Sequence, residues 1–186
     1  MTRFFLASLA PVFLLGAGCD TPTEAPDQGA DHDAEQLERA LAVLEPPVVG
    51  GCSDIRVYGT SANDRYAVLL SVHGAYIEEA YDGGDTELSF VLPHPDIDLV
   101  VQWGSDLTVN ECTDVFMDTP VVNGEAVAVE GTVHVDLDLL LTTPQPWDMS
   151  ADATITMEDV VFQTESGAER TWSIDLGTTA VGWLPG

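Results

Sequence analysis

The feature that most constrains the fold of this chain is an alternation of apolar and polar side chains, which continues from about residue 48 toward the C-terminus. In the segment 65–73, for example, the apolar side chains of Tyr66, Val68, Leu70 and Val72 alternate with Arg65, Ala67, Ser71 and His73. A period of two places successive side chains on opposite faces of a β-strand. We therefore expect strands that each have one buried and one solvated face.

Short turn-forming sequences separate the alternating segments, among them 62–64, 82–85 and Asn123-Gly124. About seven to nine short strands separated by such turns are typical of an antiparallel sandwich or barrel. We therefore expect residues 47–186 to form an all-β domain, an antiparallel β-sandwich of the immunoglobulin-like type. The alternation slips in phase near Asp159, which predicts a β-bulge at that position.

The N-terminal segment has the organisation of an export signal. Arg3 precedes an apolar stretch over residues 4–15, which is too short to span a bilayer as a helix because a span needs about 20 residues. Small residues then lead to Cys19, in the run Gly16-Ala17-Gly18-Cys19. An acidic, proline-rich segment follows.

This arrangement resembles a bacterial lipoprotein signal peptide. The resemblance implies that residues 1–18 are removed, that Cys19 is lipidated, and that the lipid bilayer of the bacterial cell envelope is a partner of the mature protein. An ordinary secretory cleavage that leaves Cys19 as a free thiol, and an uncut anchor, are the alternatives. The chain as a whole resembles uncharacterised envelope lipoproteins, and this resemblance implies no particular activity.

Residues 19–46 are expected to be an acidic tether between the lipid and the β-domain. Residues 20–33 have almost no apolar content, which predicts a disordered linker. Residues 34–45 contain good helix formers with leucines at helical spacing, which predicts a short helix that Pro46-Pro47 ends.

The three cysteines of the chain are an odd number, which is unusual for an exported protein. When Cys19 is assigned to lipid, Cys52 and Cys112 remain as a pair. Paired thiols become disulfides in an oxidising compartment, so we predict a Cys52–Cys112 bridge. Two buried free thiols are the alternative, and a zinc site is disfavoured because neither cysteine has a second cysteine or a histidine at ligand spacing.

The chain is strongly acidic, with 32 Asp and Glu residues against five basic residues and a formal net charge of −27. Such a surface repels phosphate backbones, so nucleic acid is excluded as a partner. Three explanations of the acidity stay open: a solvated surface that keeps the domain soluble, divalent-cation binding, and attraction to a basic partner.

One candidate calcium site is a glycine-containing turn with three carboxylates, Asp82, Asp85 and Glu87. Calcium takes six to eight oxygen ligands and tolerates flexible loops of this kind. The alternative interpretation is a simple hairpin turn, because the segment lacks the ligand spacing of an EF-hand.

A second candidate metal site consists of His134, Asp136 and Asp138, which are two residues apart and therefore share one face of a strand. The alternative is an ordinary polar outer face opposite an apolar core. Trp147, which lies in a proline-flanked loop, is a candidate for an exposed contact with an envelope protein or a glycan. Its alternative role is a lid residue over one end of the domain.

The common catalytic motifs are absent from the sequence: no GxSxG, SxxK, HExxH, P-loop or GxGxxG pattern occurs. We therefore expect no catalytic residues and no cofactor, with calcium as the one candidate ion. The expected function is that of a membrane-anchored, non-catalytic envelope lipoprotein with a structural or binding role. A calcium-dependent binding or adhesion module is the second hypothesis, and a hydrolase with an unrecognised site is the third.

Overall fold

The computed structural model of the protein describes residues 28–182, with the exception of 46, 114–116, 143 and 146–147. Within this part of the chain there are two helices and eight strands, and all strand pairs are antiparallel. The elements are α1 (Gln28–Val43), β1 (Val48–Cys52), β2 (Ile55–Thr60), β3 (Tyr66–Val72), α2 (Tyr76–Tyr81), β4 (Glu87–Leu92), β5 (Ile97–Ser105), β6 (Val121–Leu139), β7 (Ser150–Thr164) and β8 (Glu169–Gly182).

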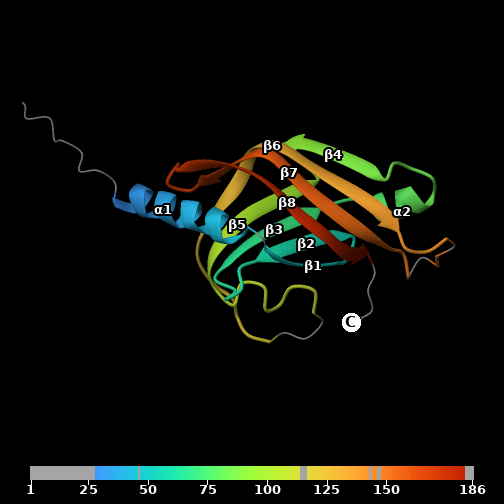
Figure 1. Ribbon diagram of the computed structural model, residues 1–186, viewed down its shortest axis with the longest axis horizontal. Coiled ribbons are helices and arrows are strands. Elements are labelled where there is room, and N and C mark those ends of the chain that lie inside the picture. Colours follow the sequence, from blue (N-terminus) through green and yellow to red (C-terminus); the bar gives the residue numbers. More distant parts are fainter. Residues whose placement is uncertain (1–27, 46, 114–116, 143, 146–147, 183–186) are drawn as a thin grey trace, which may run out of the picture.

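The strands form one curled sheet, a half-barrel (Figure 1). The hydrogen-bonded order is β1-β2-β3-β5-β6-β7-β8, and β4 pairs with β6 beside this path. On one edge of β6, β5 pairs with the first part of the strand and β4 with residues 131–136, while β7 pairs along the other edge. The expectation of an antiparallel all-β domain is confirmed. The two separate sheets of an immunoglobulin-like sandwich are replaced by a single continuous sheet.

The long strands bend at bulges instead of ending, which is the physical reason for the single sheet. Gly131 adopts a φ of +113°, and a Cβ atom at this position would lie 2.5 Å from the Cα atom of Val160. The register of β7 against β8 shifts between Met157 and Val160, and Asp159 has a φ of +51°. The bulge predicted near Asp159 is therefore confirmed. Since bulges increase the local bend and twist, β6 and β7 can curve around one core.

The two end strands of the path approach each other at one point. The backbone N–H of Gly182 donates a hydrogen bond to the carbonyl oxygen of Ser53, which makes an isolated antiparallel bridge next to the end of β1. A Cβ atom on Gly51 would lie 2.8 Å from the carbonyl oxygen of Ala180, so glycine at position 51 allows β1 and β8 to pack closely. The curl of the sheet therefore brings its first and last strands together.

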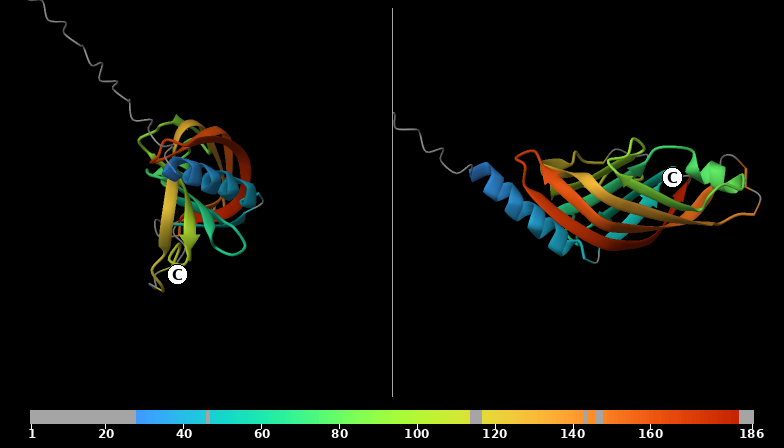
Figure 2. Two further views of the ribbon diagram at one scale, coloured as in Figure 1. Left: turned by 90° about the vertical axis from the view of Figure 1, so that its left-hand side faces the viewer. Right: turned by 90° about the horizontal axis from the view of Figure 1, so that it is seen from above.

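The helix α1 lies across one end of the curled sheet (Figure 2, left). Its residues Leu37 and Ala40, together with Leu44 just beyond it, are completely buried in the core. Beside them, the Trp172 Nε1–H donates a hydrogen bond to Glu45 Oε1 at 2.6 Å. The structure differs here from the expected tether, because a helix that buries its apolar side is stabilised by tertiary packing and becomes part of the domain. It also begins at Gln28, within the segment expected to be a disordered linker.

No helix of the described residues has both the length and the apolar composition needed to cross a membrane. The short helix α2 lies at the other end of the sheet from α1 (Figure 1). It buries Ile77 and Ala80, and its Tyr81 hydroxyl donates to the carbonyl oxygen of Ser150 at 2.6 Å. Because α2 contains only six residues, its sequence is too short to show a helical period, and the alternation pattern does not predict it.

The predicted disulfide between Cys52 and Cys112 is present. It joins the end of β1 to the long connection between β5 and β6. The same connection is held by Arg56 of β2, whose Nε donates to Glu111 Oε2 at 2.6 Å and whose second nitrogen donates to Oε1 at 3.0 Å. This hydrogen bond raises the pKa of the Arg56 guanidinium above its ordinary value. The connection is therefore attached to the sheet by both a covalent bond and a bidentate ion pair.

Candidate functional site

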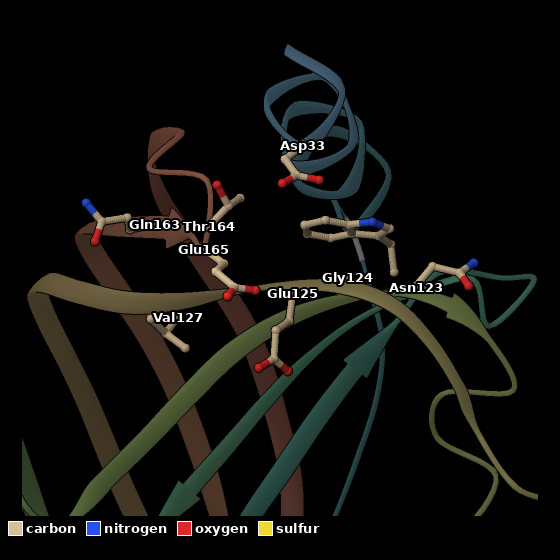
Figure 3. A pocket seen from close by; sticks show the side chains of 9 residues that line it. Asp33, Asn123, Gly124, Glu125, Val127, Gln163, Thr164 and Glu165 are labelled. Carbon is tan, nitrogen blue, oxygen red and sulfur yellow. The ribbon is translucent and has the colours of Figure 1, made fainter. Parts of the chain in front are cut away.

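A cavity of about 560 Å³ lies beside α1, where this helix meets β5, β6 and the end of β7. This volume falls in the usual range of small-molecule sites, roughly 300–1,000 Å³. In Figure 3, Asp33 extends from α1, Thr164 and Glu165 lie at the end of β7, and Glu125 and Val127 lie on the other side of the β6 ribbon. The complete lining consists of Asp33, Trp103, Asn123, Gly124, Glu125, Val127, Gln163, Thr164 and Glu165.

One wall of the cavity is the indole ring of Trp103 on β5, which is only 5% exposed. Trp103 and Gly124 are paired across β5 and β6. A Cβ atom on Gly124 would lie 2.8 Å from Trp103 Nε1 and even closer to two carbon atoms of the ring, so glycine leaves the space that the indole occupies. Among the described residues, none accepts a hydrogen bond from Nε1. Since no buried side-chain nitrogen or oxygen atom of the described residues lacks a hydrogen-bond partner, this N–H is accessible to solvent.

The cavity is acidic. Asp33, Glu125 and Glu165 come from three separate segments of the chain, and no Lys, Arg or His residue is among the lining residues. Glu125 accepts a hydrogen bond from Gln102 at 3.1 Å, and Asp33 Oδ1 lies 3.8 Å from His32 Nδ1. Clefts lined by charges of one sign concentrate ions of the opposite sign, so this cavity favours cationic ligands.

A smaller hollow of about 40 Å³ shares Trp103 and Asn123 with the cavity. Arg65 and Gln36 also line this hollow. Arg65 is exposed, and its guanidinium forms no ion pair with a described carboxylate within 4 Å. The positive charge of Arg65 therefore lines the smaller hollow, and no basic residue is among the lining residues of the main cavity.

The strand residues predicted as metal ligands lie on the outer face of the sheet. His134 and Asp136 line a shallow hollow of about 450 Å³ together with Glu87 of β4, which is directly opposite Asp136 in the strand register. His134 Nε2 lies 3.6 Å from Glu158 Oε2 on β7. Asp138 is further along β6, opposite Asp152, and does not line this hollow.

The turn residues predicted as calcium ligands connect α2 to β4 instead of forming a hairpin turn. Asp82 is the C-cap residue of α2, and the N–H groups of Gly83 and Gly84 donate to carbonyl oxygens of the helix. Asp85 follows as an exposed residue. The structure thus brings Glu87 close to the strand residues but leaves Asp82 and Asp85 in the turn.

Within the described part of the chain, no three His, Cys, Asp or Glu side chains are arranged to hold a metal ion. The calcium hypothesis therefore rests on the sequence pattern alone. Two further predictions, lipidation of Cys19 and an exposed contact at Trp147, concern residues outside those that the structure describes.

Sequence patterns did not indicate the cavity. Asp33 lies in the segment predicted to be a disordered linker, and Trp103 belongs to none of the predicted sites. The Asn123-Gly124 pair was taken only as a turn signal, although both residues belong to β6. The one feature of the sequence that could have drawn attention to this region is Asp33 directly before a helix with leucines at helical spacing, because such a helix must pack on something.

Comparison with known proteins adds no homologue to this description. No protein-family model, no curated protein and no solved structure matches the chain.

Proposed function

We propose that this protein is a lipid-anchored, non-catalytic binding protein of the bacterial cell envelope. The observation that carries the anchoring is the sequence pattern at the N-terminus, an apolar stretch over residues 4–15 followed by small residues and Cys19. Lipid on Cys19 would attach the chain to a membrane. The acidic surface is consistent with an exported protein that stays soluble, and it disfavours nucleic acid as a partner.

The packing of α1 supports a short connection between lipid and domain. Since the described helix begins at Gln28, only residues 20–27 separate it from Cys19. Even a fully extended segment of this length spans at most about 30 Å. The proposal therefore holds the α1 end of the domain, and the cavity lined by Asp33, close to the membrane surface.

The binding role rests on the cavity beside α1. It combines charged, amide and indole groups from four separated segments of the chain, and its volume suits a small molecule. Within the described residues, this site unites more polar groups of different chemistry than the outer hollow around His134.

The anchor is tested by expressing the full chain in a bacterium that is fed an alkyne-labelled fatty acid. The wild-type protein is expected to carry the label and to sediment with membranes. The variant Cys19→Ser is expected to lose both properties, while the neighbouring conservative change Thr21→Ser keeps both. A Cys19→Ser protein that still sediments with membranes after a salt wash would contradict the anchor.

A further inference from the structure

We propose that the free edge of β4 is a docking site for an extended, basic segment of another protein, which would add a strand to the sheet. The strand β4 pairs with β6 along one of its edges, over residues 87–92 opposite residues 131–136, and the register of this pairing has no shift. Figure 1 shows β4 beside β6 at the border of the sheet. The inference goes beyond the proposed function, because it depends on neither the lipid anchor nor the cavity beside α1.

The backbone groups of β4 that face away from β6 belong to Glu87, Ser89 and Val91. Just before β4, the N–H of Leu137 donates to the carbonyl oxygen of Thr86 at 2.8 Å, in line with the register of the two strands. Because hydrogen-bonded pairs alternate along an antiparallel ladder, every second residue from Thr86 onward points its N–H and C=O toward β6, and the residues between them point theirs away. Within the described part of the chain, these outward groups have no hydrogen-bond partner. The edge is therefore a template for another strand.

This edge lacks the features with which natural proteins commonly block strand pairing. Lysine, proline and bulges are the usual protections, and β4 contains none of them before Pro93. Val91 is 68% exposed on the outer face, whereas Phe90 is buried on the inner face, where its ring packs against Tyr76 with the centroids 5.4 Å apart. An added strand that has apolar side chains on its inner face would therefore extend the apolar surface that β4 already forms.

Charge decides which kind of strand fits this edge. The strands β4, β6 and β7 contain Asp and Glu residues but no Lys or Arg. On the outer face, Glu87 lies opposite Asp136 in the register, and both line the hollow of about 450 Å³ together with the small Ser89. Neighbouring strands are only about 4.8 Å apart, so a long basic side chain opposite Ser89 on an added strand reaches across it to these carboxylates. The charge of this face is therefore complementary to a segment rich in lysine or arginine.

A second copy of this chain fits the same edge less well. Each copy has a formal net charge of −27, and like charges brought together oppose association. If two copies of β4 paired antiparallel about Ser89, Glu87 of each copy would lie opposite Val91 of the other copy, with no basic side chain to pair with it. In strand addition, main-chain hydrogen bonds supply affinity and alternate side chains supply specificity. The occupant that satisfies both requirements is an extended segment with basic side chains at alternate positions.

The test measures the binding of fluorescein-labelled peptides to the full chain, purified in a neutral detergent, by fluorescence anisotropy. The first probe is a short end-capped peptide that alternates valine with lysine. The second probe carries N-methyl groups on the lysine amides, which removes the donors that face β4 when the lysines are on the outer face. The third probe has glutamate in place of lysine. We expect the first probe to bind at least about tenfold more tightly than either of the others.

Variants localise the binding. Ser89→Pro removes an outward N–H and leaves the hydrogen bonds to β6 in place, so it is expected to weaken binding of the lysine peptide by at least about tenfold. Ser89→Ala keeps the N–H and is expected to leave the affinity unchanged. Glu87→Gln is expected to weaken binding by about threefold, whereas Asp54→Asn, in the exposed turn between β1 and β2, leaves it unchanged. If Ser89→Pro fails to fold, as judged by circular dichroism, the N-methylated peptide still decides the question.

Several results would overturn the inference. Undiminished binding of the N-methylated peptide, or of the lysine peptide to a folded Ser89→Pro variant, would show that the main chain of β4 is not involved. Equal binding of the glutamate peptide would exclude charge selection, and an equal loss in Asp54→Asn would assign the binding to the overall negative field. A wild-type dimer in analytical ultracentrifugation that Ser89→Pro abolishes would identify a second copy as the occupant. No binding of the lysine peptide would leave the edge without this partner, and the anchor would be unaffected because labelling and sedimentation test it separately.

Discussion

The burial of Leu37 provides a direct test of whether α1 belongs to the folded domain. The side chain is fully buried where α1 crosses the end of the curled sheet. Replacing a buried leucine by alanine removes its transfer free energy and leaves a cavity, which together cost about 2–5 kcal/mol. Alanine is a slightly better helix former than leucine, but this gain is only a few tenths of a kcal/mol. We therefore expect Leu37→Ala to lower the free energy of unfolding by about 3 kcal/mol.

The assay is urea-induced unfolding of the full chain in its oxidised form, followed by circular dichroism, with a thermal melt as a second measurement. A loss of about 3 kcal/mol corresponds to a decrease of roughly 6–12 °C in Tm for a domain of this size. Val43→Ala is the matched control, because Val43 is in the same helix and is 42% exposed. A surface change of this kind is expected to stay within about 0.5 kcal/mol.

The reasoning is refuted if Leu37→Ala and Val43→Ala have the same small effect on the free energy of unfolding. In that case α1 would contribute no packing energy, and residues 28–43 would act as the tether that the sequence suggested. A loss shown by Leu37→Ala alone would instead establish that the helix is a structural part of the domain.

Three further predictions concern the rest of the fold. Reducing the Cys52–Cys112 bridge, whose cysteines are 60 residues apart, should lower the free energy of unfolding by about 4 kcal/mol, measured by urea unfolding with and without reductant; a change below about 1 kcal/mol would contradict the chain-entropy argument. Gly131→Ala should cost more than about 2 kcal/mol, because φ is positive and the new methyl group would meet the backbone of β7; an unchanged unfolding midpoint would be incompatible with the bulge. The hydrogen bond from the Tyr76 hydroxyl to Asp96 raises the pKa of Tyr76, so its stabilisation should be present below pH of about 10 and be lost as pH rises and the phenol ionises; carbon-13 NMR of labelled tyrosine should show this pKa fall in Asp96→Asn, and no fall would exclude the bond.

The sequence was a reliable guide to local structure. The alternation predicted an antiparallel all-β domain, the slip in phase near Asp159 located a bulge, and the cysteine count predicted the Cys52–Cys112 bridge. Each of these features depends on residues that are close in sequence or on simple counting. A period of two, however, only tells which side chains are buried. The inner face of a curled sheet and the inner face of a sandwich require the same pattern, so the pattern could not distinguish them.

The features that the sequence could not predict depend on contacts between segments that are far apart in the chain. The leucines of residues 34–45 fit a free amphipathic helix as well as a packed one, and only the open end of the sheet decides between them. The cavity is assembled from α1, β5, β6 and the end of β7, which are far apart in the chain. Its residues follow no spacing rule, because the curl of the sheet and not the local sequence brings Asp33 near Glu165.

The bridge between Ser53 and Gly182 has a consequence for how the chain reaches its final shape. The antiparallel neighbours β6, β7 and β8 follow one another directly and can pair soon after they are made, whereas the contact of β8 with the end of β1 joins residues from nearly opposite ends of the domain. Contacts of such long sequence separation carry the largest loop-closure entropy and form slowly. Until they form, the edges of β1 and β8 are open to pairing with other chains. Cys52 is next to Ser53, so oxidation to Cys112 fixes the strand end that β8 must find. The redox conditions during folding should therefore decide how long these edges stay exposed and how much of the protein aggregates.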